Sequence, residues 1–141
     1  MSRTWQIREC RHDDCQAVLD LWRQAEATPS RTDTIEDLQR LVGEETDLFL
    51  VAEERESLVG TIIAGWDGWR GNMYRLAVLS DSRRRGIARS LVAEAERRLR
   101  AKGARRITAL VVKSEREAMA FWQAIGYGHD ARMARYVKTR H

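Results

Sequence analysis

Apolar positions along the chain follow two different spacings, and the first is typical of strands. Trp5 and Ile7 alternate with polar neighbours, and longer apolar or alternating runs follow further along the chain. The longer runs are residues 47–53, 58–65, 73–79 and 107–112. A charged turn over residues 54–57 separates the first two of these, so we expect an antiparallel hairpin there.

The second spacing is helical, with apolar residues recurring every three or four positions. Four stretches show it: Val18, Leu21, Trp22 and Ala25; Ile35, Leu38, Leu41 and Val42; Leu91, Val92, Ala95 and Leu99; and Ala118, Phe121, Trp122 and Ile125. Capping residues support these assignments. The predicted N-caps are Asp13 or Asp14, Thr34 with Asp37, and Ser114 with Glu117, and the predicted ends are Gly43, Gly103 and Gly126.

The order of these elements predicts a mixed α/β fold. A strand and two helices precede three mainly antiparallel strands, and a helix, a strand, a helix and a terminal strand pair around Tyr127 and Tyr136 complete the chain. The helix after residue 86 acts as a crossover, which requires strand 107–112 to run parallel to strand 73–79. No linker divides the 141 residues, so we expect one domain over residues 1–141.

Residues 76–91, LAVLSDSRRRGIARSL, carry the clearest candidate chemistry. An apolar strand leads through a polar turn and three arginines to Gly86 and the start of a helix. Glycine lets the backbone approach an anion, and the first amides of a helix have no intrahelical acceptor. This arrangement predicts a site for phosphate groups.

Composition narrows the remaining possibilities. Hydrophobic residues at 43% and charged residues at 33% are ordinary for a soluble protein, and the absence of a long apolar segment predicts a cytoplasmic location without membrane association. Cys10, His12 and Cys15 form an incomplete ligand set, so no metal is expected. The net charge of +4 suits an anionic partner, but the arginines are dispersed and no nucleic-acid-binding motif accompanies them.

The phosphate-loop residues resemble the acetyl-CoA signature of the GNAT superfamily of N-acetyltransferases. That signature is Arg or Gln, two residues, Gly, one residue, then Gly or Ala, and residues 83–88 (RRRGIA) fit it. The family's later A-x-x-F-Y-x-x-x-G-F pattern is echoed by Ala118, Phe121, Trp122, Gly126 and Tyr127. Residues 64–71 look closest to small bacterial YpeA-type acetyltransferases.

The resemblance implies a twisted mixed sheet with helices on both faces, whose central parallel strands splay apart to admit the pantetheine arm of acetyl-CoA. Main-chain groups of Leu76, Ala77 and Val78 would pair with pantetheine, and an amide near Ala77 and Val78 would polarise the thioester. The implied phosphate and remaining cofactor residues are Arg83, Arg84, Arg85, Gly86, Ile87, Ala88, Arg89, Glu115 and Trp122. Glu115 replaces the family's asparagine, which weakens one contact.

The catalytic positions depart from the family pattern. Asn72 stands where a glutamate base is common, and asparagine accepts no proton at neutral pH, although it can orient water. Asp67 is the nearest carboxylate and is either a water-mediated base or an Asp-Gly turn residue. Trp122 replaces the usual tyrosine acid, for which Tyr127 and Tyr136 are the possible substitutes.

The predicted activity is acetyl-CoA-dependent transfer to a primary amine. An α-amine, with a reference pKa near 8, is neutral often enough at pH 7 to react without a strong base, which favours N-termini and small amines. Trp22, Trp69, Arg70 and Arg75 are candidates to line the acceptor pocket, although each is equally explained by packing. A non-catalytic acyl-CoA sensor is the alternative, and the resemblance also suggests a homodimer.

Overall fold

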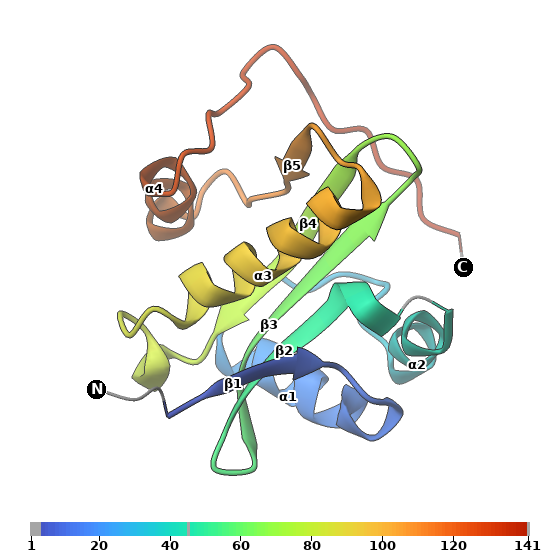
Figure 1. Cartoon of the computed structure of the whole chain (residues 1–141), viewed down its shortest axis with the longest axis vertical. Helices are drawn as coiled ribbons and strands as arrows, with labels where there is room; N and C mark the ends of the chain where they lie inside the picture. The colour runs from blue at the N-terminus through green and yellow to red at the C-terminus, as the bar shows by residue number, and fades with distance from the viewer. Residues whose placement is uncertain (1–3, 45, 141) are drawn as a thin grey trace. The chain divides into compact units, whose positions relative to one another are not determined.

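The computed structural model describes residues 4–44 and 46–140, and it divides at residue 110 into two units. The first unit holds a five-stranded sheet in the order β1-β2-β3-β4-β5. Its strands are β1 (Gln6–Glu9), β2 (Phe49–Glu54), β3 (Ser57–Trp66), β4 (Gly71–Val78) and β5 (Ile107–Ala109). β1 to β4 pair antiparallel and β4 pairs parallel with β5, which confirms the mixed sheet (Figure 1).

Helices cover both faces of this sheet. The helices of the first unit are α1 (Cys15–Gln24), α2 (Ile35–Glu44) and α3 (Ile87–Lys102), and short 3-10 turns span His12–Asp14, Thr46–Leu48 and Ser80–Ser82. Figure 1 shows α3 running along β3 and β4. Gly60 of β3 faces α3, and its neighbour Thr61 contacts α1. Because adjacent residues of a strand point to opposite faces of the sheet, α1 and α3 lie on opposite faces.

Two glycines let α3 lie close to the sheet. A Cβ at Gly71 would lie 2.8 Å from Leu99 Cδ1, and one at Gly60 would lie 3.0 Å from Leu91 Cδ1. Both leucines are completely buried. Side chains at these two strand positions would therefore push the helix away from the sheet.

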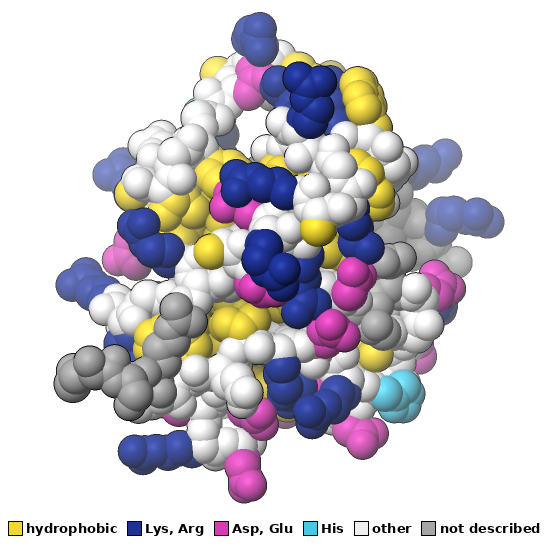
Figure 2. Space-filling model, in the orientation of Figure 1, with side chains coloured by type: hydrophobic (Ala, Val, Ile, Leu, Met, Phe, Trp, Pro, Cys, Tyr) yellow, Lys and Arg dark blue, Asp and Glu magenta, His cyan; other side chains and the backbone are white. Residues whose placement is uncertain are grey.

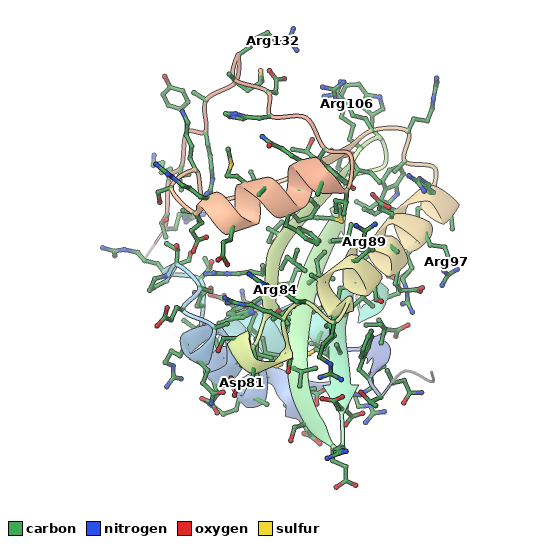
Figure 3. All side chains as sticks on the ribbon, turned by 90° about the vertical axis from the view of Figure 1, so that its left-hand side faces the viewer. Asp81, Arg84, Arg89, Arg97, Arg106 and Arg132 are labelled. Atoms are coloured by element: carbon green, nitrogen blue, oxygen red, sulfur yellow. The ribbon has the colours of Figure 1, made fainter. Side chains whose placement is uncertain are left out.

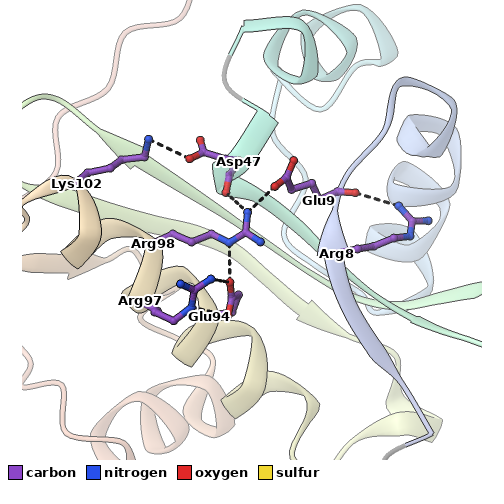
Figure 4. Close-up of polar contacts among 7 residues, drawn as sticks. All are labelled: Arg8, Glu9, Asp47, Glu94, Arg97, Arg98 and Lys102. Carbon is purple, nitrogen blue, oxygen red and sulfur yellow. Dashed lines mark hydrogen bonds and ion pairs between the residues drawn. The ribbon is translucent and has the colours of Figure 1, made fainter.

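An ionic cluster holds α3 to the first strand (Figure 4). Arg98 donates to Glu94 at 2.7 Å, to Glu9 of β1 at 2.8 Å and to the carbonyl of Asp47 at 2.8 Å. Lys102 lies 3.0 Å from the Asp47 carboxylate. The Glu94–Arg98 pair, four residues apart on α3, is thus part of a larger cluster.

The β2–β3 hairpin has the turn that its strand twist favours. Arg55 and Glu56 have φ angles of 51° and 67°, as a two-residue type I′ turn requires. Thr34 bonds the amide of Asp37 at 3.1 Å, and Gly103 follows α3 with φ 115°. The predicted hairpin, the Thr34 cap and this helix end are confirmed.

Two further predicted helix ends lie within one residue of their predicted positions but differ in detail. Asp14 occupies the N-cap position of α1, but its carboxylate bonds Arg8 and the amide of Arg11 instead of capping the helix. The carboxylate is satisfied by the guanidinium, which is a stronger donor than an amide. α2 continues past Gly43 to Glu44, because a helix tolerates glycine in its last turn at modest cost.

The strand after α3 is shorter than predicted, because β5 ends at Ala109 and the side chain of Leu110 is 45% exposed. The second unit contains α4 (Arg116–Ala124), and Gly126, with φ 102°, follows its end as predicted. Its N-cap is Glu115 without a side-chain cap bond, so the Ser114–Glu117 box is wrong. The described residues after 126 contain no strand, so the predicted terminal pair is wrong too; an apolar-polar pattern forms a strand only beside a partner edge.

Candidate active site

A bulge in the middle of β4 changes the direction of the strand. Thr61 of β3 lies opposite Ala77, whereas Ile63 lies opposite Tyr74, so β4 holds one residue more than β3 over this stretch. Arg75 has φ 57°, a left-handed conformation that costs a side-chain-bearing residue about 1–2 kcal/mol. Contacts elsewhere must therefore stabilise it.

Beyond the bulge, β4 has an open edge. Pairing with β5 ends at Met73, whose carbonyl accepts the amide of Leu110 at 2.9 Å. The Leu79 amide bonds Val59 of β3 at 3.0 Å, and since successive residues point to opposite sides, Leu76 and Val78 point to the open edge. Ala77 points its main chain back toward β3.

The side chain of Arg83 hydrogen-bonds to one of these outward main-chain groups. Its Nε donates to the Val78 carbonyl at 3.1 Å, and its second contact is with the carbonyl of Ala25 at 3.4 Å. Leu76 lies beyond the last β5 pair at Met73, so its outward N–H and C=O have no partner strand among the described residues. A ligand that carries amide groups can pair with them as an additional strand does.

The phosphate loop presents its amides in the expected way. Arg84 has φ 62° and Gly86 φ 92°, so two left-handed residues turn the chain into α3. The first amide with a helical bond is that of Ser90, which donates to the Gly86 carbonyl at 3.0 Å. Over the part of the chain that is described, the N–H groups of residues 84–89 have no acceptor. Amides in this arrangement, at the positive end of the helix dipole, have the geometry of an anion-binding turn, and phosphate binding here remains a prediction.

The loop arginines divide into two groups. Arg85 pairs with Glu54 of β2 at 3.1 Å and lies 5.4 Å from the Trp5 ring centroid. The hydrogen bonds from Arg85 and Thr4 lower the pKa of Glu54 to about 2. Arg84 and Arg89 are exposed and extend from the loop and the first turn of α3 (Figure 3). A side-chain contact of Arg85 with the cofactor remains a prediction.

The face of β4 opposite α3 carries polar and aromatic side chains. Met73 is buried on the side of Gly71 and α3, so Asn72 and Tyr74 point to the other face, where both are exposed. Partial burial raises the pKa of Tyr74 above its ordinary value. Tyr74 was not predicted from the sequence, although its alternation with Asn72 and Met73 places it beside the predicted reaction centre.

A pocket of about 340 Å³ lies on the α1 side of the first unit. Its lining residues are Leu19, Trp22, Arg23, Ala27, Pro29, Ser30 and Asp33. Trp22 is 4% exposed, so the packing interpretation holds for its side chain, although one part of it also faces the pocket. The pocket is a candidate for acceptor binding.

Asp67 has the contacts of a turn residue. Its Oδ1 accepts the amides of Trp69 at 2.8 Å and Arg70 at 2.7 Å. These bonds, with that of Arg70 the larger, lower the pKa of Asp67. Trp69 is 68% exposed, and the Arg70 guanidinium lies 3.9 Å from its ring centroid. The contacts support the turn interpretation, and the role of Asp67 as a base remains a prediction.

In the second unit, the predicted residues lie on and after α4. Glu115 is the extended residue before the helix. The ring of Trp122 packs edge-on against Phe121, with centroids 5.6 Å apart, and against Tyr127 at 4.9 Å. Trp122 therefore has an aromatic packing role, and Tyr136 is 94% exposed.

The described residues contain neither a metal-binding cluster nor a membrane-spanning helix. No three side chains of the metal-binding types among them are grouped to hold an ion, and none of their helices is long and apolar enough to span a bilayer. Cys10 and Cys15 are buried free thiols, and burial raises the pKa of both. Figure 2 shows basic and acidic side chains interspersed over α3.

Comparison with known proteins agrees with this geometry. The family model described as "Acetyltransferase (GNAT) family" matches residues 9–127, and the chain therefore belongs to the GNAT acetyltransferase family. An acetyltransferase of Sodalis glossinidius is 40% identical over 114 residues, which cover 81% of this chain and 80% of that protein.

Two solved structures share the fold at lower identity. PaiA N-acetyltransferase from Thermoplasma acidophilum, in complex with coenzyme A, has a TM-score of 0.79 at 19% identity and covers 92% of both chains. A ribosomal-protein-alanine N-acetyltransferase from Brucella melitensis has a TM-score of 0.76 at 18% identity, covering 98% of this chain and 100% of its own.

Proposed function

We propose that the protein transfers the acetyl group of acetyl-CoA directly to a primary amine, either a protein N-terminus or a small amine. One observation carries the proposal: the open main-chain edge at Leu76 leads, within one continuous segment, to a loop whose amides at residues 84–89 have no acceptor in the described chain. An extended, amide-containing arm that ends in phosphates complements both parts.

Each part of the cofactor has a complementary partner. The amides of pantetheine pair with Leu76, and the pyrophosphate accepts from the amides of residues 84–89, with Arg84 and Arg89 adding positive charge. The N–H of Leu76 is the proposed donor to the thioester oxygen, because Ala77 points toward β3. CoA bound to the PaiA structure, which shares the fold, supports this cofactor.

In the reaction, the neutral amine nitrogen attacks the thioester carbon and the carbon–sulfur bond breaks. CoA leaves as a thiolate, and the proton of the acylated nitrogen passes to water or to a side chain. An α-amine has the lower pKa among protein amines and needs the least help from a base, which suits a site with Asn72 on its strand. Tyr127 is the proposed acid in place of the tyrosine that Trp122 replaces.

A thiol-release assay tests the proposal. The protein is mixed with acetyl-CoA and with peptides, polyamines or aminoglycosides, free CoA is measured, and mass spectrometry locates the acetyl group. We expect CoA release that depends on the acceptor and is fastest for α-amines. Thermal stabilisation by acetyl-CoA without turnover on any amine would instead identify an acyl-CoA-sensing module.

A further inference from the structure

A buried chain of hydrogen bonds links α1 to the bulge of β4. Trp22 Nε1 donates to Thr61 Oγ1 at 2.9 Å, and the Thr61 hydroxyl donates to the Arg75 carbonyl, also at 2.9 Å. Thr61 is 0% exposed. Because Trp22 supplies a proton to the hydroxyl and the hydroxyl has a single proton of its own, its direction is fixed toward Arg75.

The side chain of Arg75 is held on the same face of the sheet. Its guanidinium donates to the Thr28 carbonyl at 2.9 Å, pairs with Asp33 and lies 4.8 Å from the Trp22 ring centroid. Asp33 and Trp22 also line the 340 Å³ pocket on the α1 side. The left-handed residue of the bulge is thus anchored to the walls of the candidate acceptor pocket.

We propose that Trp22, Thr61 and Arg75 act together as positioning residues for acetyl transfer. They hold residue 75 in its left-handed conformation, which directs the N–H of Leu76 out of the sheet toward the thioester oxygen. The inference rests on the proposed function. It adds that the geometry of the carbonyl-polarising amide is set from the side of the sheet that carries the candidate acceptor pocket.

The test is the Thr61→Val variant, which keeps the shape and removes the hydroxyl, with Thr61→Ser as the conservative variant that restores it. Val51→Ala is the stability control, because Val51 lies opposite Thr61 on β2, is buried and takes no part in the hydrogen-bond chain. The readout is the infrared carbonyl stretch of bound acetyl-CoA labelled with ¹³C at the thioester carbon. This measurement needs no acceptor.

We expect a lowered carbonyl frequency in wild type, Thr61→Ser and Val51→Ala, and a frequency close to that of free acetyl-CoA in Thr61→Val. In turnover, kcat of Thr61→Val falls about tenfold or more while the Kd for acetyl-CoA stays within about threefold. If Thr61→Val does not fold, Arg75→Lys, which lacks the planar fork, is measured in the same way and is expected to lose the shift.

A lowered frequency that persists in Thr61→Val, or in Arg75→Lys where that variant replaces it, overturns the inference. So does an equal loss in Val51→Ala. A wild-type protein that binds acetyl-CoA with a shifted carbonyl but acetylates no amine refutes the proposed function alone, because the spectra still decide the inference. A wild-type protein that does not bind acetyl-CoA overturns both.

Discussion

The two glycines at the ends of α3 offer a matched test of the phosphate loop. Gly86 and Gly103 both have left-handed backbones, with φ angles of 92° and 115°. A Cβ would meet nothing closer than Trp5 at 4.0 Å at the first and Trp66 at 3.8 Å at the second, so alanine brings conformational strain without a clash. That strain is about 1–2 kcal/mol at either site.

The strain should lower a different measured quantity in each variant. In Gly103→Ala it lowers the free energy of unfolding, because the end of α3 is held in place and cannot relax. The CoA affinity of this variant stays within about twofold of wild type. The exposed loop at Gly86 relaxes instead, and CoA binding has to restore its shape. At 1.4 kcal/mol per tenfold, CoA then binds Gly86→Ala about 5- to 30-fold more weakly.

Calorimetric titration with CoA and urea unfolding measure the two quantities on the same samples. Wild-type affinity in Gly86→Ala would refute the role of the loop backbone. Equal weakening in both variants would show that the effect comes from α3 as a whole and not from the loop amides.

Three further predictions concern side chains. Arg84→Gln should weaken CoA binding about threefold or more and reduce its salt dependence. Arg85→Gln loses an ion pair with Glu54 and should change the CoA affinity less. Titrations with CoA at two salt concentrations compare the two variants. Because the pKa of Glu54 is lowered, its carboxylate stabilises the fold above the unfolded pKa of about 4.3, and this contribution is lost as the pH falls through about 2. Wild type should therefore be more stable than Glu54→Gln at neutral pH, and the difference should disappear over that interval. Thermal unfolding measured against pH checks this. Asp67→Asn can accept the same two amide bonds, so at least half of kcat should remain, and a loss of about a hundredfold with the fold intact would identify Asp67 as a base.

Local sequence patterns predicted the elements well where neighbours along the chain decide the structure. The end of α3 at Gly103 and the turn before Ser57 depend on residues within one turn of chain, and both were found. The phosphate loop was found for the same reason. Its amides are oriented by backbone conformation within a few residues, and the sequence shows the glycine that this conformation requires.

Contacts between distant residues were not predictable in this way. Arg85 pairs with Glu54, which is 31 residues away, and Arg75 with Asp33, which is 42 residues away. The strand pattern over residues 73–79 gives no sign that residue 75 is left-handed, because a bulge depends on the partner strand. The sequence therefore predicts the cofactor-binding site more clearly than it predicts the contacts that control the reaction.

The close contacts of α3 with two glycines of the sheet also determine how this helix would tilt. Leu91 and Leu99 rest over Gly60 and Gly71, two points about 12 Å apart at the 1.5 Å rise of a helix. Lifting the helix by about 1 Å at Leu99, with Leu91 as the pivot, would move Ile87, about 6 Å beyond the pivot, by about 0.5 Å the other way. A substitution at Gly71, far along the strand from the phosphate loop, would therefore change the position of the loop's amides, and distant sheet residues become a means of tuning cofactor affinity.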